Sequence, residues 1–300
     1  MMRLLLKMLA PIVFLLAAYA WWIEPARLSL TEQVVVDPER RLHRPIRLLL
    51  LTDWHLGRLS RPRALQAKMA RLTRRHASAP FDAVLLGGDY LDADPGWLPR
   101  LAPALDALTR WGVPVVGVLG NHDYTSCAGG IGPLTEFLAV RGVTVLCNGA
   151  VEVTAHGQKL WVIGLDDLQE SDTYYHPDVY RSPPEYRRAA QALDWYARFD
   201  RLEPDVPRIV LAHNPDAVHL PGRDPLAVLA GHTHGGQVML VDWLARTLHK
   251  RLHVHLPPGS AVTWAGRQVV AGRTLIVSRG IDGLPLRLGR PPEAVIVTLK

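Results

Sequence analysis

The sequence predicts an α/β domain whose core is a sandwich of two β-sheets flanked by helices, with an N-terminal membrane-anchor helix in front of it. Three observations lead to this prediction. Short, continuous apolar runs are typical of strands buried on both faces. Helical stretches alternate with the first of these runs, which is the pattern of parallel βαβ units. An apolar segment preceded by positive charges lies at the N-terminus.

The N-terminal segment has two interpretations. Residues 8–23 form an apolar run preceded by Arg3 and Lys7, and the whole stretch approaches the roughly 20 residues of a spanning helix. A cleaved signal peptide is the competing interpretation, because residues 18–20 (Ala-Tyr-Ala) resemble a cleavage site. The tryptophan pair at residues 21–22 favours the anchor, since indoles gather at membrane interfaces.

We therefore expect a membrane anchor or signal sequence over residues 1–23. Residues 24–44 are expected to form a juxtamembrane linker with a possible short strand at 33–36, and one globular domain is expected over residues 45–300. Basic residues flank the apolar run on both sides, so the positive-inside rule does not decide which side of the membrane the domain faces.

The domain itself begins as a βαβαβ unit. Five apolar runs are expected to be buried strands: residues 46–51, 83–86, 113–119, 209–211 and 226–229. Helices are expected over residues 62–76, 97–111 and 184–199. Strands near residues 160–164, 274–278 and 294–299 would complete a second sheet.

Each of the five apolar runs is followed by residue types that bind metal ions. These residues are Asp53 and His55, Asp89, Asn121, His213, and His232 with His234. Because the carboxyl ends of parallel strands lie along one edge of a sheet, we expect the seven side chains to meet there. Oxygen and nitrogen donors without a thiolate suit two divalent cations, with manganese favoured over iron or zinc. A single histidine at a strand end is more often structural, but seven donors at consecutive strand ends are improbable by chance.

The blocks DWH, GGD, GNHD, LAH and GHTH resemble, in this order, the motifs of the calcineurin-like metallophosphoesterases over residues 46–299. The resemblance implies a four-layer αββα fold and hydrolysis of phosphoesters at two metal ions. It implies that Asp89 bridges the metals and that His122 acts near the leaving group, oriented by Asp123. The remaining ligands would divide into a first group of Asp53, His55 and His234 and a second group of Asn121, His213 and His232.

The C-terminal pattern, GHTHGGQV followed by SRGIDGLPLRLGRPPEAVIVTL, is similar to the membrane-associated branch of this family. That branch includes bacterial phosphodiesterases and UDP-2,3-diacylglucosamine pyrophosphatases of lipid A synthesis. It implies a lipid-linked phosphodiester or pyrophosphate substrate and a single-pass protein of the bacterial inner membrane. Residues 241–256 form a basic amphipathic segment, either a membrane-facing lid or an ordinary helix packed on the sheets.

Two other functions stay open. A periplasmic phosphatase or phosphodiesterase acting on soluble phosphoesters or nucleotides is the main alternative, and a non-catalytic scaffold is disfavoured because all seven donors are present. The net charge of +6 suits anionic partners. Basic residues are not clustered with aromatic ones, so a nucleic-acid partner is not favoured, and no protein partner is evident. The two cysteines, Cys127 and Cys147, exclude a disulfide framework.

Overall fold

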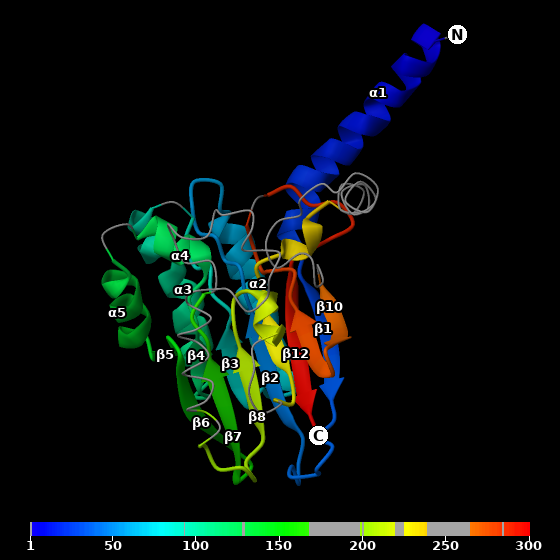
Figure 1. Cartoon of the computed structure of the whole chain (residues 1–300). Coiled ribbons are helices and arrows are strands. Elements are labelled where there is room, and N and C mark those ends of the chain that lie inside the picture. The colour runs from blue at the N-terminus through cyan, green and yellow to red at the C-terminus, as the bar shows by residue number, and fades with distance from the viewer. Residues whose placement is uncertain are drawn as a thin grey trace, which may run out of the picture.

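Two mixed six-stranded sheets pack face to face in the computed structural model (Figure 1). The structure describes residues 2–92, 94–127, 130–167, 199, 201–219, 225–238, 265–283 and 285–300. The first sheet contains, in spatial order, β1 (Ser29–Val35), β12 (Glu293–Leu299), β2 (Ile46–Leu51), β3 (Ala83–Leu86), β4 (Val115–Gly117) and β5 (Val143–Val145). The second contains β10 (Gly266–Val270), β11 (Arg273–Val277), β9 (Val228–Ala230), β8 (Arg208–Leu211), β7 (Gln158–Gly164) and β6 (Gly149–Ala155).

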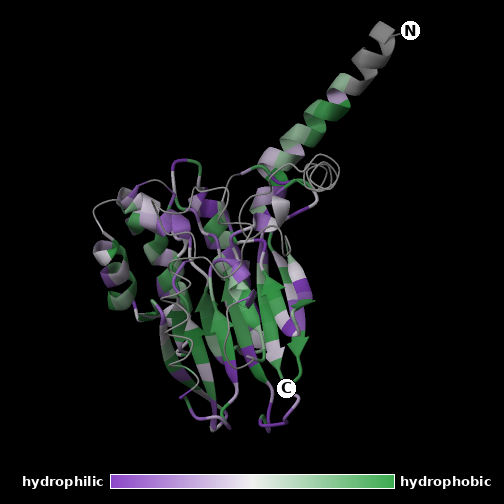
Figure 2. Cartoon of the chain, viewed as in Figure 1, coloured by the Kyte–Doolittle hydropathy of each residue, from purple (hydrophilic) through white to green (hydrophobic). Residues whose placement is uncertain are grey.

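Strand β2 shows why the apolar runs are continuous. Leu49 and Leu51 pack on the outer side of the first sheet, against α2 (Pro62–Ser78) and α3 (Leu98–Thr109). Leu48 and Leu50 face inward and pack with apolar residues of β7, β8 and β9 in the second sheet. A strand covered on both faces has no solvent-exposed side, so its sequence does not alternate between apolar and polar residues. The hydropathy colouring shows this apolar centre across the strands (Figure 2).

The parallel strands bring the expected site to one end of the sandwich. Strands β2, β3, β4 and β5 are parallel neighbours in the first sheet, and β7, β8 and β9 are parallel neighbours in the second. Their carboxyl ends lie at the end of the molecule from which α4 (Asn121–Ser126) starts and α1 (Met2–Ala18) leaves the domain (Figure 1). Helix α5 (Gly132–Val140) packs beside β5.

Several sequence predictions need correction. The C-terminal strand β12 lies in the first sheet, between β1 and β2, because it pairs antiparallel with β2. The short strand expected at 33–36 is confirmed in part, because β1 covers Ser29–Val35 within the expected linker and pairs in parallel with β12 at the sheet edge. The third expected strand is regular only over Val115–Gly117. Strands β5, β6 and β10 were not expected. The predicted segments 184–198 and 241–256 lie outside the described residues.

The N-terminal segment differs from the expected anchor. Helix α1 has 17 residues, and its α-helical pattern gives way at Tyr19–Ile23 to a π-helical turn, η1. Among the described helices, none combines the length and the apolar character needed to cross a bilayer. Helix α1 projects from the domain (Figure 1) and exposes the apolar side chains of Ile12, Val13, Phe14 and Leu15.

Candidate metal centre

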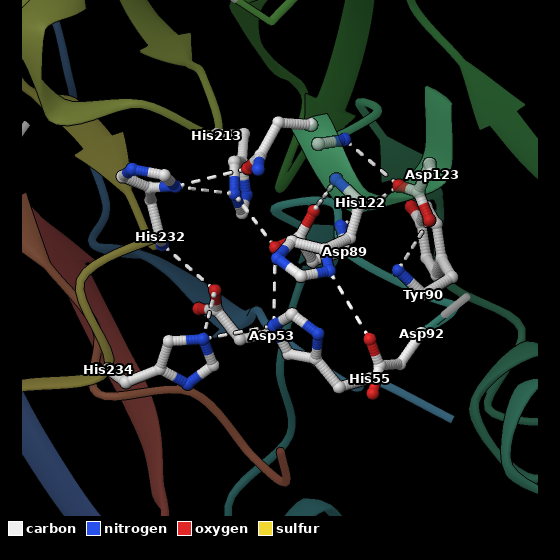
Figure 3. A network of polar contacts seen from close by, with 12 residues as sticks. Asp53, His55, Asp89, Tyr90, Asp92, His122, Asp123, His213, His232 and His234 are labelled. Atoms are coloured by element: carbon white, nitrogen blue, oxygen red, sulfur yellow. Dashed lines mark hydrogen bonds and ion pairs between the residues drawn. The ribbon is translucent and has the colours of Figure 1, made fainter. Parts of the chain in front are cut away.

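The structure brings all seven predicted metal-binding residues together at the carboxyl ends of the strands (Figure 3). Asp53 and His55 follow β2, Asp89 follows β3, and Asn121 is the first residue of α4 after β4. The remaining three come from the second sheet: His213 follows β8, and His232 and His234 follow β9.

One group of donors forms around His55. Its Nε2 atom lies 2.9 Å from Nε2 of His234 and 3.2 Å from Oδ2 of Asp89. Nε2 of His234 also lies 3.6 Å from Oδ1 of Asp53. These four residues each offer a ligand atom within 4.8 Å of the others, as one cation requires.

A second group shares Asp89 with the first. Nε2 of His213 lies 3.1 Å from the same Oδ2 atom of Asp89. Nδ1 of His232 lies 3.2 Å from Nε2 of His213 and 3.2 Å from Oδ1 of Asn121. A single carboxylate oxygen therefore faces both groups, which is the position of a ligand that bridges two cations.

The protein part of the centre is chemically suited to metal ions. Oδ2 of Asp53 and Nδ1 of His234 are buried without a hydrogen-bond partner among the described residues. A buried polar atom without a partner costs folding free energy. Imidazole nitrogens that face one another also leave lone pairs without a donor, and a cation would satisfy them. Two carboxylates, one amide and four imidazoles are the donors that manganese, iron and zinc accept in proteins. The residues present thus fit a pair of divalent cations.

Charge is concentrated at Asp89. Burial acts to raise the pKa of this carboxyl, but the neighbouring His213 and His55 outweigh burial and hold the pKa well below its usual value. Asp53 has the opposite balance, because burial dominates and raises its pKa. The two histidines therefore favour the ionised form of the carboxylate that lies between the two groups.

The main chain at the donors adopts unusual conformations. Of ten non-glycine residues with positive φ in the described chain, five are predicted ligands, at +43° to +72°. They are Asp53, His55, Asp89, His232 and His234. Such conformations are disfavoured for residues with a Cβ atom and gather at functional sites. Tight strand-end turns aim these side chains at one point.

Two loops approach closely behind Asp89. A Cβ atom added to Gly120 would lie 2.2 Å from Oδ1 of Asp89, and one added to Gly88 would lie 2.5 Å from the Gly120 amide nitrogen. Gly88 also has a φ of +84°. Glycine is required at both positions for the Asp89 turn to pack against the start of α4.

The structure gives His122 a different carboxylate partner from the one expected. The buried Asp123 carboxylate accepts hydrogen bonds from the main-chain amides of Asp89, Tyr90, Leu91 and Gly120. Nδ1 of His122 lies 3.4 Å from Oδ1 of Asp92, and its main-chain amide donates to Oδ1 of Asp89 at 2.9 Å. The expected pairing of Asp123 with His122 is thus replaced by a pairing with Asp92.

From the sequence, Asp92 is interpreted as either a local cap or a group that supports a site residue, and its position beside His122 agrees with the second interpretation. The available signal was its position three residues after Asp89, on the same turn that follows β3. Asp166 follows β7, and its carboxylate accepts a hydrogen bond from the Tyr124 hydroxyl. This bond links α4, which carries His122, to the end of β7 in the second sheet.

The chain is similar to a protein family and to several known proteins. The model of the calcineurin-like phosphoesterase family matches residues 46–236. The phosphodiesterase YaeI of Escherichia coli is 28% identical over 260 residues, covering 85% of this chain and 82% of its own. A metallophosphoesterase of Aquifex aeolicus is also 28% identical over 260 residues, covering 85% of both chains. A 5'-nucleotidase precursor of Thermus thermophilus aligns with a TM-score of 0.46 at 17% identity, over 85% of this chain and 55% of that protein.

The matched region contains every predicted ligand, from Asp53 to His234. The chain carries the family's order of strand-end blocks and folds them into a shared cluster of divalent-metal donors. It belongs to the calcineurin-like phosphoesterases and is a metal-dependent hydrolase of phosphoric esters.

Proposed function

We propose that the chain hydrolyses phosphodiester or pyrophosphate bonds with two divalent cations, manganese being the preferred metal. The observation that carries this proposal is the position of Asp89, whose Oδ2 atom lies 3.2 Å from His55 and 3.1 Å from His213. Asp53, His55 and His234 would hold one cation, and Asn121, His213 and His232 the other, with Asp89 between them. Bound cations supply water activation near neutral pH and neutralise charge on the phosphoryl oxygens.

In this proposal His122 donates a proton to the leaving oxygen. Its side chain is 42% exposed at the edge of the centre, and its ring contacts that of His55 edge-on, with the ring centres 4.6 Å apart. Asp92 Oδ1 lies 3.4 Å from Nδ1, so Nε2 is the nitrogen that would face a substrate. Asp123 acts indirectly, by fixing the main chain that carries Asp89.

The substrate class is proposed to be a lipid-linked phosphodiester or pyrophosphate such as UDP-2,3-diacylglucosamine, at the bacterial inner membrane. The exposed apolar side chains of α1 and the exposed Trp22 and Ile23 beside the domain support a lipid environment. The phosphodiesterase name of the Escherichia coli relative supports a diester. Soluble phosphoesters or nucleotides are the second candidate, favoured by the part-exposed position of His122.

The general activity is tested with a synthetic aryl phosphodiester and Mn²⁺. His122→Ala should lose most turnover yet bind two equivalents of Mn²⁺ by elemental analysis, since His122 belongs to neither of the two proposed donor groups, although it lies beside His55 and Asp92. Asp89→Ala should lose both turnover and the binding of two Mn²⁺ equivalents. Turnover of His122→Ala equal to that of the unmodified protein would refute the assigned role.

The chain offers a matched control for His122. His156 is 40% exposed and pairs with Asp82 at 3.1 Å, but it lies in the turn between β6 and β7, away from the centre. His156→Ala should retain full turnover. A loss equal to that of His122→Ala would show that removing any exposed, carboxylate-paired histidine damages the protein.

The substrate class is tested by incubating the protein with UDP-2,3-diacylglucosamine in detergent and measuring UMP and lipid phosphate. Release of both is expected. Absence of release under conditions where the aryl diester is cleaved would remove the lipid substrate and leave the soluble alternative, to be measured with nucleotide diesters.

A further inference from the structure

A buried arginine lies behind the first group of metal donors. The guanidinium of Arg287 is 1% exposed and donates to the main-chain oxygens of Asp282 at 2.6 Å and Arg279 at 2.8 Å. It makes longer contacts of 3.4 Å with the main-chain oxygens of His234 and Arg290. Only a guanidinium presents several N–H groups in fixed directions, so one side chain here holds several separate carbonyls.

The carbonyls that Arg287 holds belong to the wall of the centre. The amides of Ile281 and Asp282 donate to the main-chain oxygens of Thr52 and Asp53, at 2.9 and 3.1 Å. This aligns residues 281–282 with the strand end that carries Asp53.

Gly283 continues this wall against the imidazoles. A Cβ atom there would lie 3.1 Å from Cε1 of His234 and 3.6 Å from Cδ2 of His55. The main chain that follows the Asp282 carbonyl held by Arg287 therefore leaves no room for a side chain beside the rings of these two histidines.

The same short segment is joined to the base of α1. The main-chain amide of Arg287 donates to the carbonyl of Ala20 at 2.9 Å, and that of Gly289 donates to Oε2 of Glu24 at 3.0 Å. Glu24 is only 2% exposed. The N-terminal segment and the His234 turn are thus attached to opposite sides of residues 287–289, because Leu288 also donates to the carbonyl of Gln237.

We propose that Arg287 is a positioning residue for the metal-binding group of Asp53, His55 and His234, and that Ala20 and Glu24 belong to the same support. The inference rests on the proposed function in one respect, that these three residues bind a cation. Groups that orient metal ligands typically change metal affinity by about tenfold to a hundredfold when removed. None of the four guanidinium hydrogen bonds described for Arg287 goes to the group of Asn121, His213 and His232, so the metal affinity of that group should change much less.

The test measures Mn²⁺ binding to the Arg287→Lys variant by calorimetric titration and by electron paramagnetic resonance. The unmodified protein should bind two ions and show a spin-coupled pair. Arg287→Lys should keep one ion at near-unchanged affinity and bind the other about ten times more weakly or worse. At intermediate Mn²⁺ its spectrum should be that of an isolated ion.

Arg208→Lys is the matched control for loss of a buried arginine. Arg208 is 4% exposed and donates to the main-chain oxygens of Phe199 at 2.9 Å and Glu203 at 3.2 Å, at the start of β8 and so at the opposite strand end from His213. Its variant should lose thermal stability but bind two ions normally. Normal binding of both ions by Arg287→Lys would overturn the proposal, whatever the change in its melting temperature.

Glu24 provides a second test if Arg287→Lys does not fold. Glu24→Ala should weaken the same single ion, and Glu24→Gln should restore it because the amide oxygen can still accept from Gly289. Unchanged binding in Glu24→Ala would overturn the proposal. Turnover of the aryl diester is measured separately. A protein that binds two ions without cleaving the diester would contradict the proposed function, whereas the role of Arg287 would still be decided by the Mn²⁺ titrations.

Discussion

Gly120→Ala should damage the centre although it changes no donor. The new Cβ atom would lie 2.2 Å from Oδ1 and 2.7 Å from the amide nitrogen of Asp89, so the Asp89 turn must move by about 1 Å to restore normal contact. The φ of Gly120 is −111°, which any residue adopts, and the effect is therefore purely steric.

The magnitude follows from this displacement. Overpacking a rigid site costs about 1–3 kcal/mol of folding free energy. For a domain of this size that corresponds to roughly 2–12 °C in melting temperature. A shift of about 1 Å in the shared carboxylate should lower turnover about a hundredfold.

The assay compares Gly120→Ala with Gly132→Ala, using turnover of the aryl diester, Mn²⁺ stoichiometry and thermal melting. A Cβ atom at Gly132 would meet no atom within 4 Å, so this control should keep full activity and change stability by less than about 1 kcal/mol. Full turnover and two bound Mn²⁺ ions in Gly120→Ala would refute the reasoning, because the Asp89 turn would then tolerate the crowding that the geometry forbids.

Three further results are expected. Removing metal with a chelator should lower the melting temperature of the protein. Mn²⁺ at a hundredfold excess over its dissociation constant should restore about 2.7 kcal/mol of folding free energy, or roughly 5–10 °C in melting temperature. Equal melting temperatures with and without Mn²⁺ would contradict this. Cys147 is exposed, but desolvation by its neighbours and the charge of Asp166 raise the pKa of its thiol to about 11. Its alkylation at pH 8 should therefore be more than about a hundredfold slower in the folded protein than in the unfolded chain, and should accelerate up to about pH 11. A half-maximal rate near the ordinary thiol pKa of about 8.5 would exclude the shift. Tyr124→Phe should lose about 1 kcal/mol of stability in denaturant unfolding, because Asp166 loses its phenol donor, and should still bind two Mn²⁺ ions.

The core strands and the positions of the donors could be predicted from local sequence. Residues 46–51 and 83–86 are strands with the expected bounds, because a run covered on both faces has a distinctive composition. The convergence of Asp53 with His234 followed from the parallel arrangement, which places strand ends along one edge.

Long-range pairing could not be predicted in the same way. The apolar pattern of β12 is equally compatible with either sheet. Only its pairing with β2, which is far away in sequence, determines which sheet β12 joins. Only the C-terminal half of β1 could be predicted as a strand, because Thr31, Glu32 and Gln33 at the sheet edge do not separate its first half from a linker.

The partner of His122 depends on local geometry that composition does not show. Adjacent residues of a helix point in different directions, and Asp123 turns back to the main-chain amides around Asp89. Asp92, which is distant from His122 in sequence, reaches the ring.

The left-handed main-chain conformations at five donors set folding stability against metal binding. Each such residue costs of order 1–3 kcal/mol, which the rest of the sandwich must offset. Glycine would relieve that cost at His55 or His232 and remove the imidazole with it. Glycine at either of these two turns should therefore give a more stable protein that has lost one metal donor.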